Sequence, residues 1–332
     1  MPAARRNGTP YFRNLLAILV AALGVGILHL NVDPMETGGQ PMARAASIDG
    51  PMLRIPPSPS LPEKLSTSKD EKAGEEEGQQ APDLAFADDP NVLRGIWAVK
   101  MASELLSRGC DSFGKVPDYT SVMFKQERIN GLLSDMQTID LKIRHEPFSV
   151  YMKWSTGDKG RQLIYVDGQN EGHMLVQPGG LKGRLTGVMS LDPNGSLAMS
   201  ESRYPITKAG LLELAQTILE YQQADIARGT GFTCELRDHQ TFDERDCFLY
   251  IIEYASPEVN DVYRKSIVYI DKEFSMPVCA KNYTWARDAN PETIDEETLV
   301  EFYAYTDLRM QRQLGAVDFD QHNSDYRLRV RR

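Results

Sequence analysis

Histidine is scarce in this chain, and the spacings that mark common enzyme sites are missing. No two histidines stand in an H-x-x-x-H or other metal-binding spacing, and none lies near a cysteine pair. The sequence also lacks a G-x-S-x-G nucleophile elbow and a phosphate-binding P-loop. Carboxylates are plentiful, but no spacing singles out an acid–base pair. The sequence therefore gives no specific support for a metal, a cofactor or an enzymatic activity. The five histidines are His29, His145, His173, His239 and His322.

A basic stripe is missing as well. The chain has 37 basic and 47 acidic residues, giving a net charge of −10. Because nucleic-acid binding depends on neutralising phosphates, this charge balance excludes a nucleic-acid partner. One basic stretch, RLRVRR at 327–332, closes the acidic chain. It either touches anionic lipid or wall polymer, or is a solvated chain end.

One long apolar run lies near the N-terminus. Arg5, Arg6 and Arg13 precede the uninterrupted apolar sequence from Leu15 to Leu30. Basic residues followed by apolar sequence indicate export, with the basic end kept inside. Residues 1–30 are thus a signal or membrane anchor, with residues 14–30 contacting the inner membrane. We favour an uncleaved anchor because no suitable cleavage site follows the run, and a cleaved signal is the alternative. Either case places the rest on the periplasmic side of the cell envelope.

Residues 31–89 are predicted to be a disordered linker. Five prolines between 51 and 62 are followed by the acidic run KDEKAGEEE at 69–77, and few large apolar groups are present. Ordering such a stretch would cost conformational entropy with little burial in return. The acidic run is interpreted as a solvated spacer.

Residues 90–332 are predicted to form a single β-rich domain. A helix is expected first, with Val92, Ile96, Val99 and Leu106 at near-helical spacing after Pro90-Asn91. Beyond it the apolar pattern changes to period two, which is typical of strands with one buried face. The alternating stretches lie at 119–128, 139–144 and 148–154, with turn signals such as Asn130-Gly131 and Asp167-Gly168 between strands.

A second helix is predicted between Thr207 as its cap and Gly229 as its end. Strands are expected again after it. The fold class is α+β and mainly antiparallel β: a strongly curved sheet or unclosed β-barrel with a helix packed in its concavity, preceded by an N-terminal helix. The later strands are expected at Phe232–Thr241, Cys247–Ala255, Val262–Asp271, Val278–Trp285 and Thr298–Tyr305.

Several stretches resemble a known family. They are LKIRHEPFSVYMKW from Leu141 to Trp154, IYVDG from Ile164 to Gly168, SRYPIT from Ser202 to Thr207, and Asp318-Phe319-Asp320 near the end. With them the chain resembles domain-of-unknown-function family 1571, a family of uncharacterised bacterial envelope proteins, over about residues 92–328. The order of a strand, R-x-x-P-F, an aromatic-rich strand and a strand ending in D-G is also similar to the periplasmic lipoprotein carriers. That looser similarity implies an unclosed β-barrel that shelters lipid chains.

The apolar strand faces are the first candidate binding site. Met and aromatic side chains suit an adaptable lipid-binding wall, and the alternative is that these residues fill a closed core. Arg144 and the Arg203-Tyr204 pair are candidates for holding an anionic head group, unless local carboxylates bind the arginines. The apolar candidates are Phe124, Ile139, Leu141, Ile143, Val150, Met152 and Trp154.

Four cysteines are compatible with an oxidising compartment. Cys234 and Cys247 flank a predicted hairpin centred near Gln240-Thr241, which places them opposite each other as a candidate disulfide. Reduced, buried cysteines are the alternative.

Three functions follow from the sequence. The favoured one is a non-enzymatic envelope protein that binds a lipid or lipidated protein in a half-barrel cavity. The second is a structural or interaction module of the envelope. The third is an envelope-polymer hydrolase, which requires a cleft joining residues such as His145, His173 or Asp167.

Overall fold

The structure of the protein is a computed structural model that describes residues 89–288 and 290–329. The predicted anchor at 1–30 and the predicted linker, apart from its last residue, lie outside the described residues. No helix among the described residues has both the length and the apolar character needed to cross a membrane.

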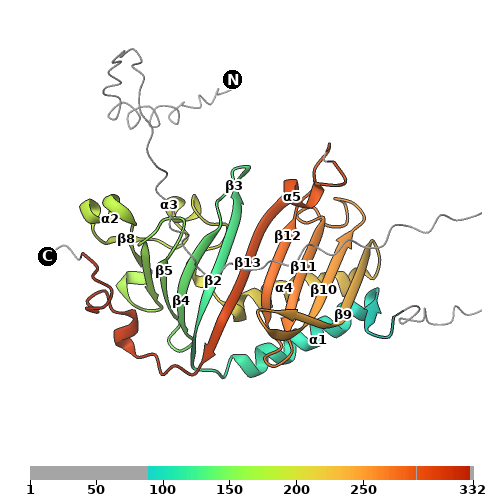
Figure 1. Cartoon of the computed structure of the whole chain (residues 1–332), viewed down its shortest axis with the longest axis horizontal. Coiled ribbons are helices and arrows are strands. Elements are labelled where there is room, and N and C mark those ends of the chain that lie inside the picture. The colour runs from blue at the N-terminus through green and yellow to red at the C-terminus, as the bar shows by residue number, and fades with distance from the viewer. Residues whose placement is uncertain (1–88, 289, 330–332) are drawn as a thin grey trace, which may run out of the picture. The chain divides into compact units, whose positions relative to one another are not determined.

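The described residues form one antiparallel sheet of thirteen strands. Its strand order is β1-β9-β10-β11-β12-β13-β2-β4-β5-β6-β7-β8, with the short β3 paired to β2. The sheet is curved, and its two edge strands, β1 and β8, do not pair with each other, so the sheet is open (Figure 1). The strands are β1 Val92–Arg94, β2 Asp118–Ile129, β3 Leu132–Leu133, β4 Gln137–Arg144, β5 Ser149–Trp154, β6 Gln162–Val166, β7 Met174–Gln177, β8 Met189–Leu191, β9 Phe232–Phe242, β10 Arg245–Tyr254, β11 Lys265–Asp271, β12 Pro277–Tyr283 and β13 Leu299–Met310.

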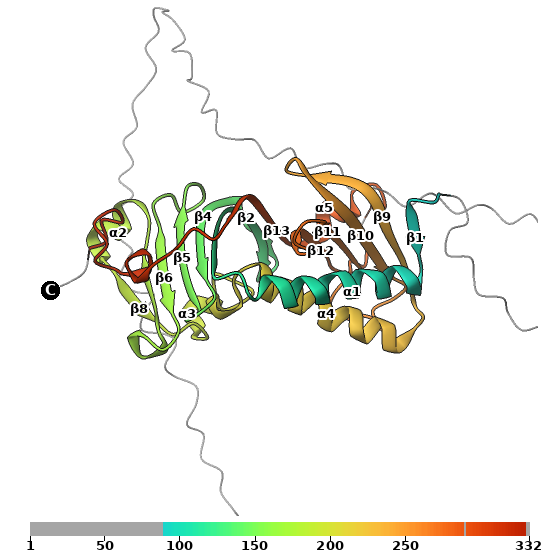
Figure 2. The ribbon, with the colours of Figure 1, turned by 90° about the horizontal axis from the view of Figure 1, so that it is seen from below.

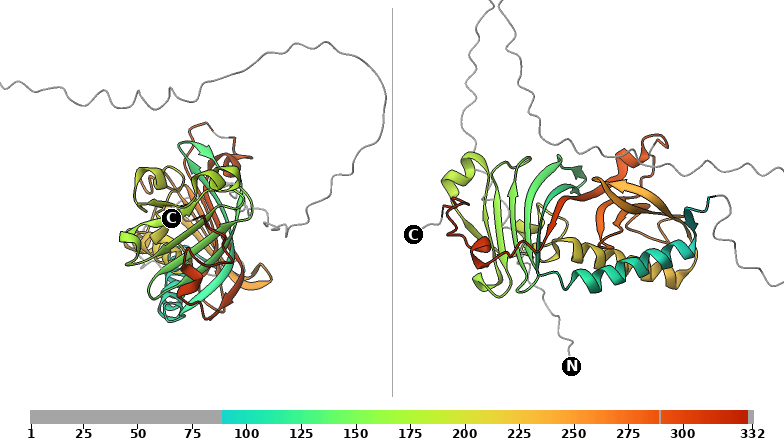
Figure 3. Two further views of the ribbon diagram at one scale, coloured as in Figure 1. Left: turned by 90° about the vertical axis from the view of Figure 1, so that its left-hand side faces the viewer. Right: turned by 60° about the horizontal axis from the view of Figure 1, so that its bottom comes forward.

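Two long helices cover only half of this sheet. α1 (Ile96–Phe113) and α4 (Leu211–Arg228) lie side by side against β9 to β12 (Figures 2 and 3). Strands β4 to β8 extend beyond the ends of both helices. The concave face of that half therefore needs another covering. Three shorter helices are α2 Gly180–Thr186, α3 Ser196–Met199 and α5 Ile294–Thr298, and 3-10 turns lie at Asn170–Gly172, Ile206–Lys208 and Ala316–Phe319.

Helix α1 buries a stripe of small and apolar residues against the sheet. Ala98, Val99, Ala102 and Leu106 are fully buried, and their spacing places them on one face of the helix. Gly109 continues this face at the point where α1 crosses the β11–β12 turn. A Cβ atom there would lie 2.1 Å from the carbonyl oxygen of Ser275, so the close packing requires glycine.

Helix α4 begins at a second crowded glycine. Gly210 has φ +104°, and a Cβ atom there would lie 2.6 Å from Ile143 Cδ1 and 2.7 Å from the Tyr119 hydroxyl. That hydroxyl accepts a hydrogen bond from the Leu211 amide at 2.9 Å, which fixes the first turn of α4 to β2. The predicted cap, Thr207, lies instead in the preceding 3-10 turn. Gly229 ends the helix in the left-handed conformation, as the sequence predicted.

The predicted fold class is confirmed: the sheet is antiparallel, curved and open, and a helix packs in its concavity. One boundary was wrong. The first element among the described residues is strand β1, which pairs with β9, and α1 starts only at Ile96 after Gly95. Val92 therefore belongs to a strand, because pairing with β9 outweighed the helical spacing of the apolar residues.

The C-terminal segment, residues 314–329, crosses the outer face of β5 and β6. Phe319 and Tyr326 are buried there with Tyr151, Ile164 and Val166 in a small apolar cluster separate from the main core. The Tyr326 ring stacks on Tyr151 with ring centroids 4.0 Å apart. The segment thus closes the outer face of the half of the sheet that the long helices leave uncovered on the inside.

Candidate functional site

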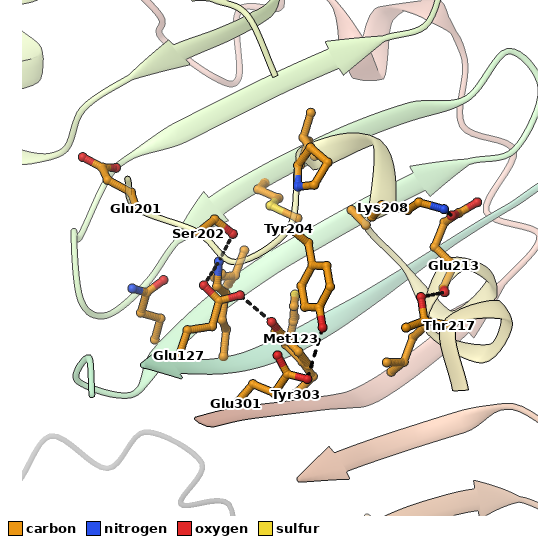
Figure 4. A pocket seen from close by; sticks show the side chains of 18 of the residues that line it. Met123, Glu127, Glu201, Ser202, Tyr204, Lys208, Glu213, Thr217, Glu301 and Tyr303 are labelled. Atoms are coloured by element: carbon orange, nitrogen blue, oxygen red, sulfur yellow. Dashed lines mark hydrogen bonds and ion pairs between the residues drawn. The ribbon is translucent and has the colours of Figure 1, made fainter. Parts of the chain in front are cut away.

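A cavity of about 540 Å³ lies on the concave side of the sheet. Its other walls are α4 and the roof segment, residues 192–209, which runs from β8 to α4 and includes α3 (Figure 4). The lining residues of α4 run from Glu213 to Asp225, a span of about 18 Å at the rise of an α-helix. Volumes of this size are typical of small-molecule sites.

One end of the cavity is apolar. It lies where β4 to β8 extend beyond the long helices, and aliphatic and methionine side chains dominate its wall. The indole of Trp154 also lies in this wall. Its Nε1 donates to Gln137 Oε1 at 2.9 Å, and the Arg161 guanidinium lies over its ring, 4.9 Å from the ring centroid. The apolar lining consists of Ile139, Met152, Trp154, Leu163, Met174, Val176, Met189, Leu191, Leu197 and Leu214.

The middle of the cavity contains two buried carboxylates. Glu127 on β2 and Glu301 on β13 are direct cross-strand partners, and each is 2% exposed. Like charges directly opposite each other destabilise a sheet. Both carboxylates therefore need cations and hydrogen-bond donors nearby.

The roof segment supplies part of this compensation. Arg203 Nε lies 2.7 Å from Glu301 Oε2, and the Arg203 amide donates to Glu127 Oε2 at 3.2 Å. Burial lowers the pKa of Arg203, but the charge of Glu301 and its hydrogen bond outweigh this effect and raise it. Lys125 Nζ lies 3.0 Å from Glu127 and also donates to Ser202. The roof segment is thus bound to two adjacent strands by charge-assisted hydrogen bonds.

Tyrosine hydroxyls complete the shell around the carboxylates. Tyr303 donates to Glu127, and Tyr263 donates to Glu301 at 2.8 Å. Tyr204, from the roof segment, donates to Glu301 at 3.3 Å. Burial and the charge of Glu301 raise the pKa of Tyr204 to about 12, so its hydroxyl keeps its proton at neutral pH.

The far end of the cavity, along the second half of α4, contains several polar side chains beside the apolar Ile252 of β10. Gln222 and Asp225 lie there on one face of the helix, with Tyr250 and Tyr254 on β10 opposite. Asp225 accepts from Tyr254 at 2.8 Å and pairs with Arg228 at 2.8 Å. Burial raises the pKa of Asp225, and the bonds to Tyr254 and Arg228 offset part of that rise.

Eight of the ten predicted ligand-binding residues lie in the cavity wall or next to it. Ile139, Met152, Trp154 and Tyr204 line the cavity. Three others are packed in the closed core next to it, and they are Leu141, Ile143 and Val150. Arg203 is bound to Glu301 beside the cavity. Whether any of them binds a ligand stays a prediction.

Two of the predicted residues do not face the cavity. Phe124 was expected on the inner face, but the inward residues of β2 are its neighbours Met123 and Lys125, and alternation places Phe124 on the outer face. Arg144 also lies outside: it donates to Ser149 and stacks over Phe319 of the C-terminal segment. The β2 sequence has apolar residues at both parities, so its pattern alone did not fix the inner face.

The candidate disulfide is not formed, and all four cysteines are free. Cys234 pairs with Ile252, and Cys247 pairs with Gln240. Cys247 and Ile252 are five positions apart on β10, which separates the two cysteines by about 16 Å along the strands. The β9–β10 turn lies at Asp243 and Glu244, both of which have positive φ, and not near residues 240–241 as predicted.

The residues named for a hydrolase lie outside the cavity lining. His145 packs edge-on against Phe113 and Tyr119, and its Nδ1 lies 2.6 Å from the Val116 carbonyl. Burial lowers its pKa, so the ring is neutral at neutral pH. His173 is held near Glu171, and Asp167 accepts from Tyr165. None of the three groups is part of the cavity wall.

The sequence analysis missed four polar residues of the cavity: Glu127, Glu301, Gln222 and Asp225. A signal for two of them exists in the sequence. Glu127 shares the inward side of its strand with the buried Met123, and Glu301 shares that of its strand with the buried Tyr303. An ionisable residue at such a position requires a partner. Gln222 and Asp225 carry no comparable signal, because polar residues are common on one side of any surface helix.

One of the comparisons with known proteins identifies a family. The model of the family described as "Protein of unknown function (DUF1571)" matches residues 116–328. Among curated proteins no match was found. Several solved structures are similar at low identity. Lipoprotein LppX of Mycobacterium tuberculosis is 12% identical with a TM-score of 0.36, over 67% of this chain and 99% of that chain.

Two further structures resemble the chain to a similar degree. A putative outer membrane lipoprotein-sorting protein domain from Vibrio parahaemolyticus is 13% identical, with a TM-score of 0.31 over 67% of this chain and 97% of that one. A DUF1329 family protein from Desulfovibrio piger is 12% identical, with a TM-score of 0.32 over the same two shares. Similarity at this level does not identify a ligand.

Proposed function

The chain belongs to the DUF1571 family, as its sequence predicted, and on that premise we propose that it is an exported envelope protein that binds an apolar or lipidated ligand in the cavity of its curved sheet. The proposed role is binding and not catalysis. The proposal depends on one observation. Side chains do not fill the space between the sheet and its cover of α4 and the roof segment, and a cavity of about 540 Å³ remains.

The wall chemistry supports an apolar ligand. Three methionines, Met152, Met174 and Met189, line the apolar end together with Trp154. Methionine has a flexible, polarisable side chain that adapts to ligands of varied shape, which suits acyl chains. An apolar cavity of this size leaves its wall without packing partners, so a chain that fills it gains both dispersion and hydrophobic contacts.

The boundary of the cavity supports reversible entry. The roof segment is attached to the sheet mainly through the Arg203–Glu301 pair and the bonds of Glu127. At the apolar end the Arg161 guanidinium pairs with Glu201 of the roof segment at 2.6 Å, and Glu201 is more than half exposed. Exposed ion pairs contribute little stability. This end of the roof segment is thus the weaker attachment, and we place ligand entry there.

The test is direct binding to the full chain. Lipid that co-purifies with the protein is extracted and identified by mass spectrometry, and the delipidated protein is titrated with N-phenyl-1-naphthylamine, an uncharged apolar fluorophore. We expect saturable binding near one probe per chain. A protein that carries no lipid and gives no saturable fluorescence change contradicts the proposed function.

A matched pair of variants ties the binding to the cavity. Thr217 on α4 lines the cavity, and its neighbour Gln216 is exposed on the same helix and does not. Thr217→Trp places an indole in the cavity and should lower probe affinity by about tenfold or more, since it removes apolar volume from the site. Gln216→Trp adds the same side chain outside and should leave affinity unchanged. If both variants bind the probe equally well, the probe binds at a site other than this cavity.

A further inference from the structure

The polar far end of the cavity contains a buried amide without a protein partner. Gln222 lies in the cavity wall and is 1% exposed, and neither Nε2 nor Oε1 of its side chain has a hydrogen-bond partner among the described residues. Buried polar groups in proteins are nearly always hydrogen-bonded, because an unpaired one loses its contact with water without compensation. An unpaired glutamine in a cavity wall therefore indicates a ligand group that completes it.

A second polar group faces the same region from the sheet. The Tyr250 hydroxyl on β10 is buried in the cavity wall, and it has no hydrogen-bond partner among the described residues other than the nearby thiol of Cys234. A thiol is a weak hydrogen-bonding group. Gln222 and Tyr250 together offer both donors and an acceptor, which fits a group that itself donates and accepts, such as a hydroxyl or an amide.

The carboxylates at this end and in the middle of the cavity are already paired. Asp225 is held by Tyr254 and Arg228, and Glu301 is held by Arg203 and its tyrosine donors. Each of these carboxylates has a cation, so the region has neither a free positive nor a free negative charge. A ligand group at this end is expected to be uncharged.

The cations of the cavity wall lead to the same conclusion. Four of the described lining residues are cations. Three of them are paired with a glutamate, and the fourth, Lys182, lies exposed on α2 at the opposite end. An anionic head group would meet carboxylates without a free cation near Gln222, and its desolvation would be uncompensated. The three pairs are Lys125–Glu127, Arg161–Glu201 and Lys208–Glu213.

We propose that Gln222 and Tyr250 form a head-group subsite for an uncharged hydroxyl- or amide-bearing lipid, such as an acylglycerol, whose acyl chain lies along α4 towards Leu214. This inference rests on the proposed function and specifies its ligand class. The chain portion occupies the apolar end, and the head group supplies the hydrogen bonds that the Gln222 amide lacks. The terminal torsion of a glutamine side chain is soft, so the amide can turn to meet either a donor or an acceptor.

The test compares ligands that share one acyl chain and differ in the head group. The full chain is loaded with N-phenyl-1-naphthylamine and the probe is displaced by 1-monooleoylglycerol, by oleate or by 1-octadecene. We expect monooleoylglycerol to displace the probe at about tenfold lower concentration than oleate, since two additional hydrogen bonds without charge desolvation are worth about that factor. Equal displacement by monooleoylglycerol and oleate, or stronger displacement by oleate, overturns the inference.

Two variants assign the preference to the subsite. Gln222→Leu keeps the size of the side chain and removes its amide, and Tyr250→Phe removes only the hydroxyl. Each should reduce the preference for monooleoylglycerol over oleate by about fivefold, and neither should weaken displacement by octadecene. If Gln222→Leu fails to fold, Tyr250→Phe alone decides. An unchanged preference in a folded variant overturns the subsite and leaves the apolar cavity intact, whereas failure of the probe itself to bind overturns the proposed function as well.

Discussion

Glu127 on β2 and Glu301 on β13 lie directly opposite each other in the sheet, and both are almost completely buried. Two adjacent buried carboxylates are tolerated because the roof segment brings Arg203 to Glu301 and its backbone amide to Glu127. The charge cluster therefore does two things. It neutralises the floor of the cavity, and it fixes the roof segment over that floor, so that the cavity stays open between them.

The first prediction concerns this cluster. Glu301→Gln removes the charge that Arg203 pairs with and leaves a partly buried guanidinium without a counterion. We expect a loss of about 2–4 kcal/mol in the free energy of unfolding, as is typical when one partner of a buried pair is removed. Urea denaturation of the full chain, followed by circular dichroism, measures the loss.

The control for this prediction is the double variant Glu301→Gln/Arg203→Met. It removes the unpaired cation as well, so we expect it to be more stable than Glu301→Gln alone by at least about 1 kcal/mol. If the double variant is the less stable of the two, the Arg203–Glu301 pair is not what stabilises this part of the roof segment.

Much of the fold was predictable because runs of strand-forming residues are separated by turn signals. The strands predicted at Phe232–Thr241 and Thr298–Tyr305 are found at Phe232–Phe242 and Leu299–Met310, although residues 300–306 of the second are buried on both faces. The α4 helix was found from its apolar stripe and its terminal Gly229. Its start was misplaced because Gly210, not a side-chain cap, begins it.

The cavity was predictable only in part. The pattern identified Ile139, Met152 and Trp154 as inward residues, but it could not separate cavity wall from closed core, because both are apolar. Leu141 faces inward like Ile139, but it is packed in the closed core, whereas Ile139 lines the cavity. That difference depends on how far α1 and α4 extend along the sheet. The length of a helix relative to a sheet is a tertiary property that strand patterning does not contain.

The second prediction tests the crowding at the start of α4. Gly210→Ala places a Cβ atom within 2.7 Å of Ile143 and Tyr119 at a residue with φ +104°. We expect a loss of about 2–4 kcal/mol, from backbone strain together with overpacking. Gly229→Ala is the control, since Gly229 also has positive φ but has open space around it. That variant should lose about 1 kcal/mol, and equal losses in thermal or urea unfolding would show that crowding at Gly210 contributes nothing.

The third prediction concerns the C-terminal segment. Tyr326 stacks on Tyr151, and its hydroxyl donates to the Asp318 carbonyl at 2.6 Å and accepts from Lys142 at 3.1 Å. Tyr326→Ala removes the ring from the outer apolar cluster and should cost about 2–4 kcal/mol. Tyr326→Phe keeps the ring and loses only the hydroxyl bonds, so about 1 kcal/mol is expected. The two values are compared by urea denaturation, and similar losses for both variants would mean that ring stacking is not the main contribution.

The fourth prediction concerns pH and Asp225. Burial raises the pKa of this carboxyl above its usual 3.8, so between 3.8 and the raised value the folded protein binds more protons than the unfolded chain. Stability from this group therefore increases as the pH falls through the raised pKa, and the cost of burying the charged form is fully present at neutral pH. Asp225→Asn removes that titration while the amide oxygen still accepts from Tyr254. Asp225→Asn should therefore gain more stability relative to the wild type at pH 7 than at pH 4. The measured quantity is the free energy of unfolding of the variant minus that of the wild type, and it should be more positive at pH 7. Urea denaturation of both proteins at the two pH values measures it, and a difference that is constant or that grows towards pH 4 would show that the Asp225 charge is not destabilised by its burial beside the cavity.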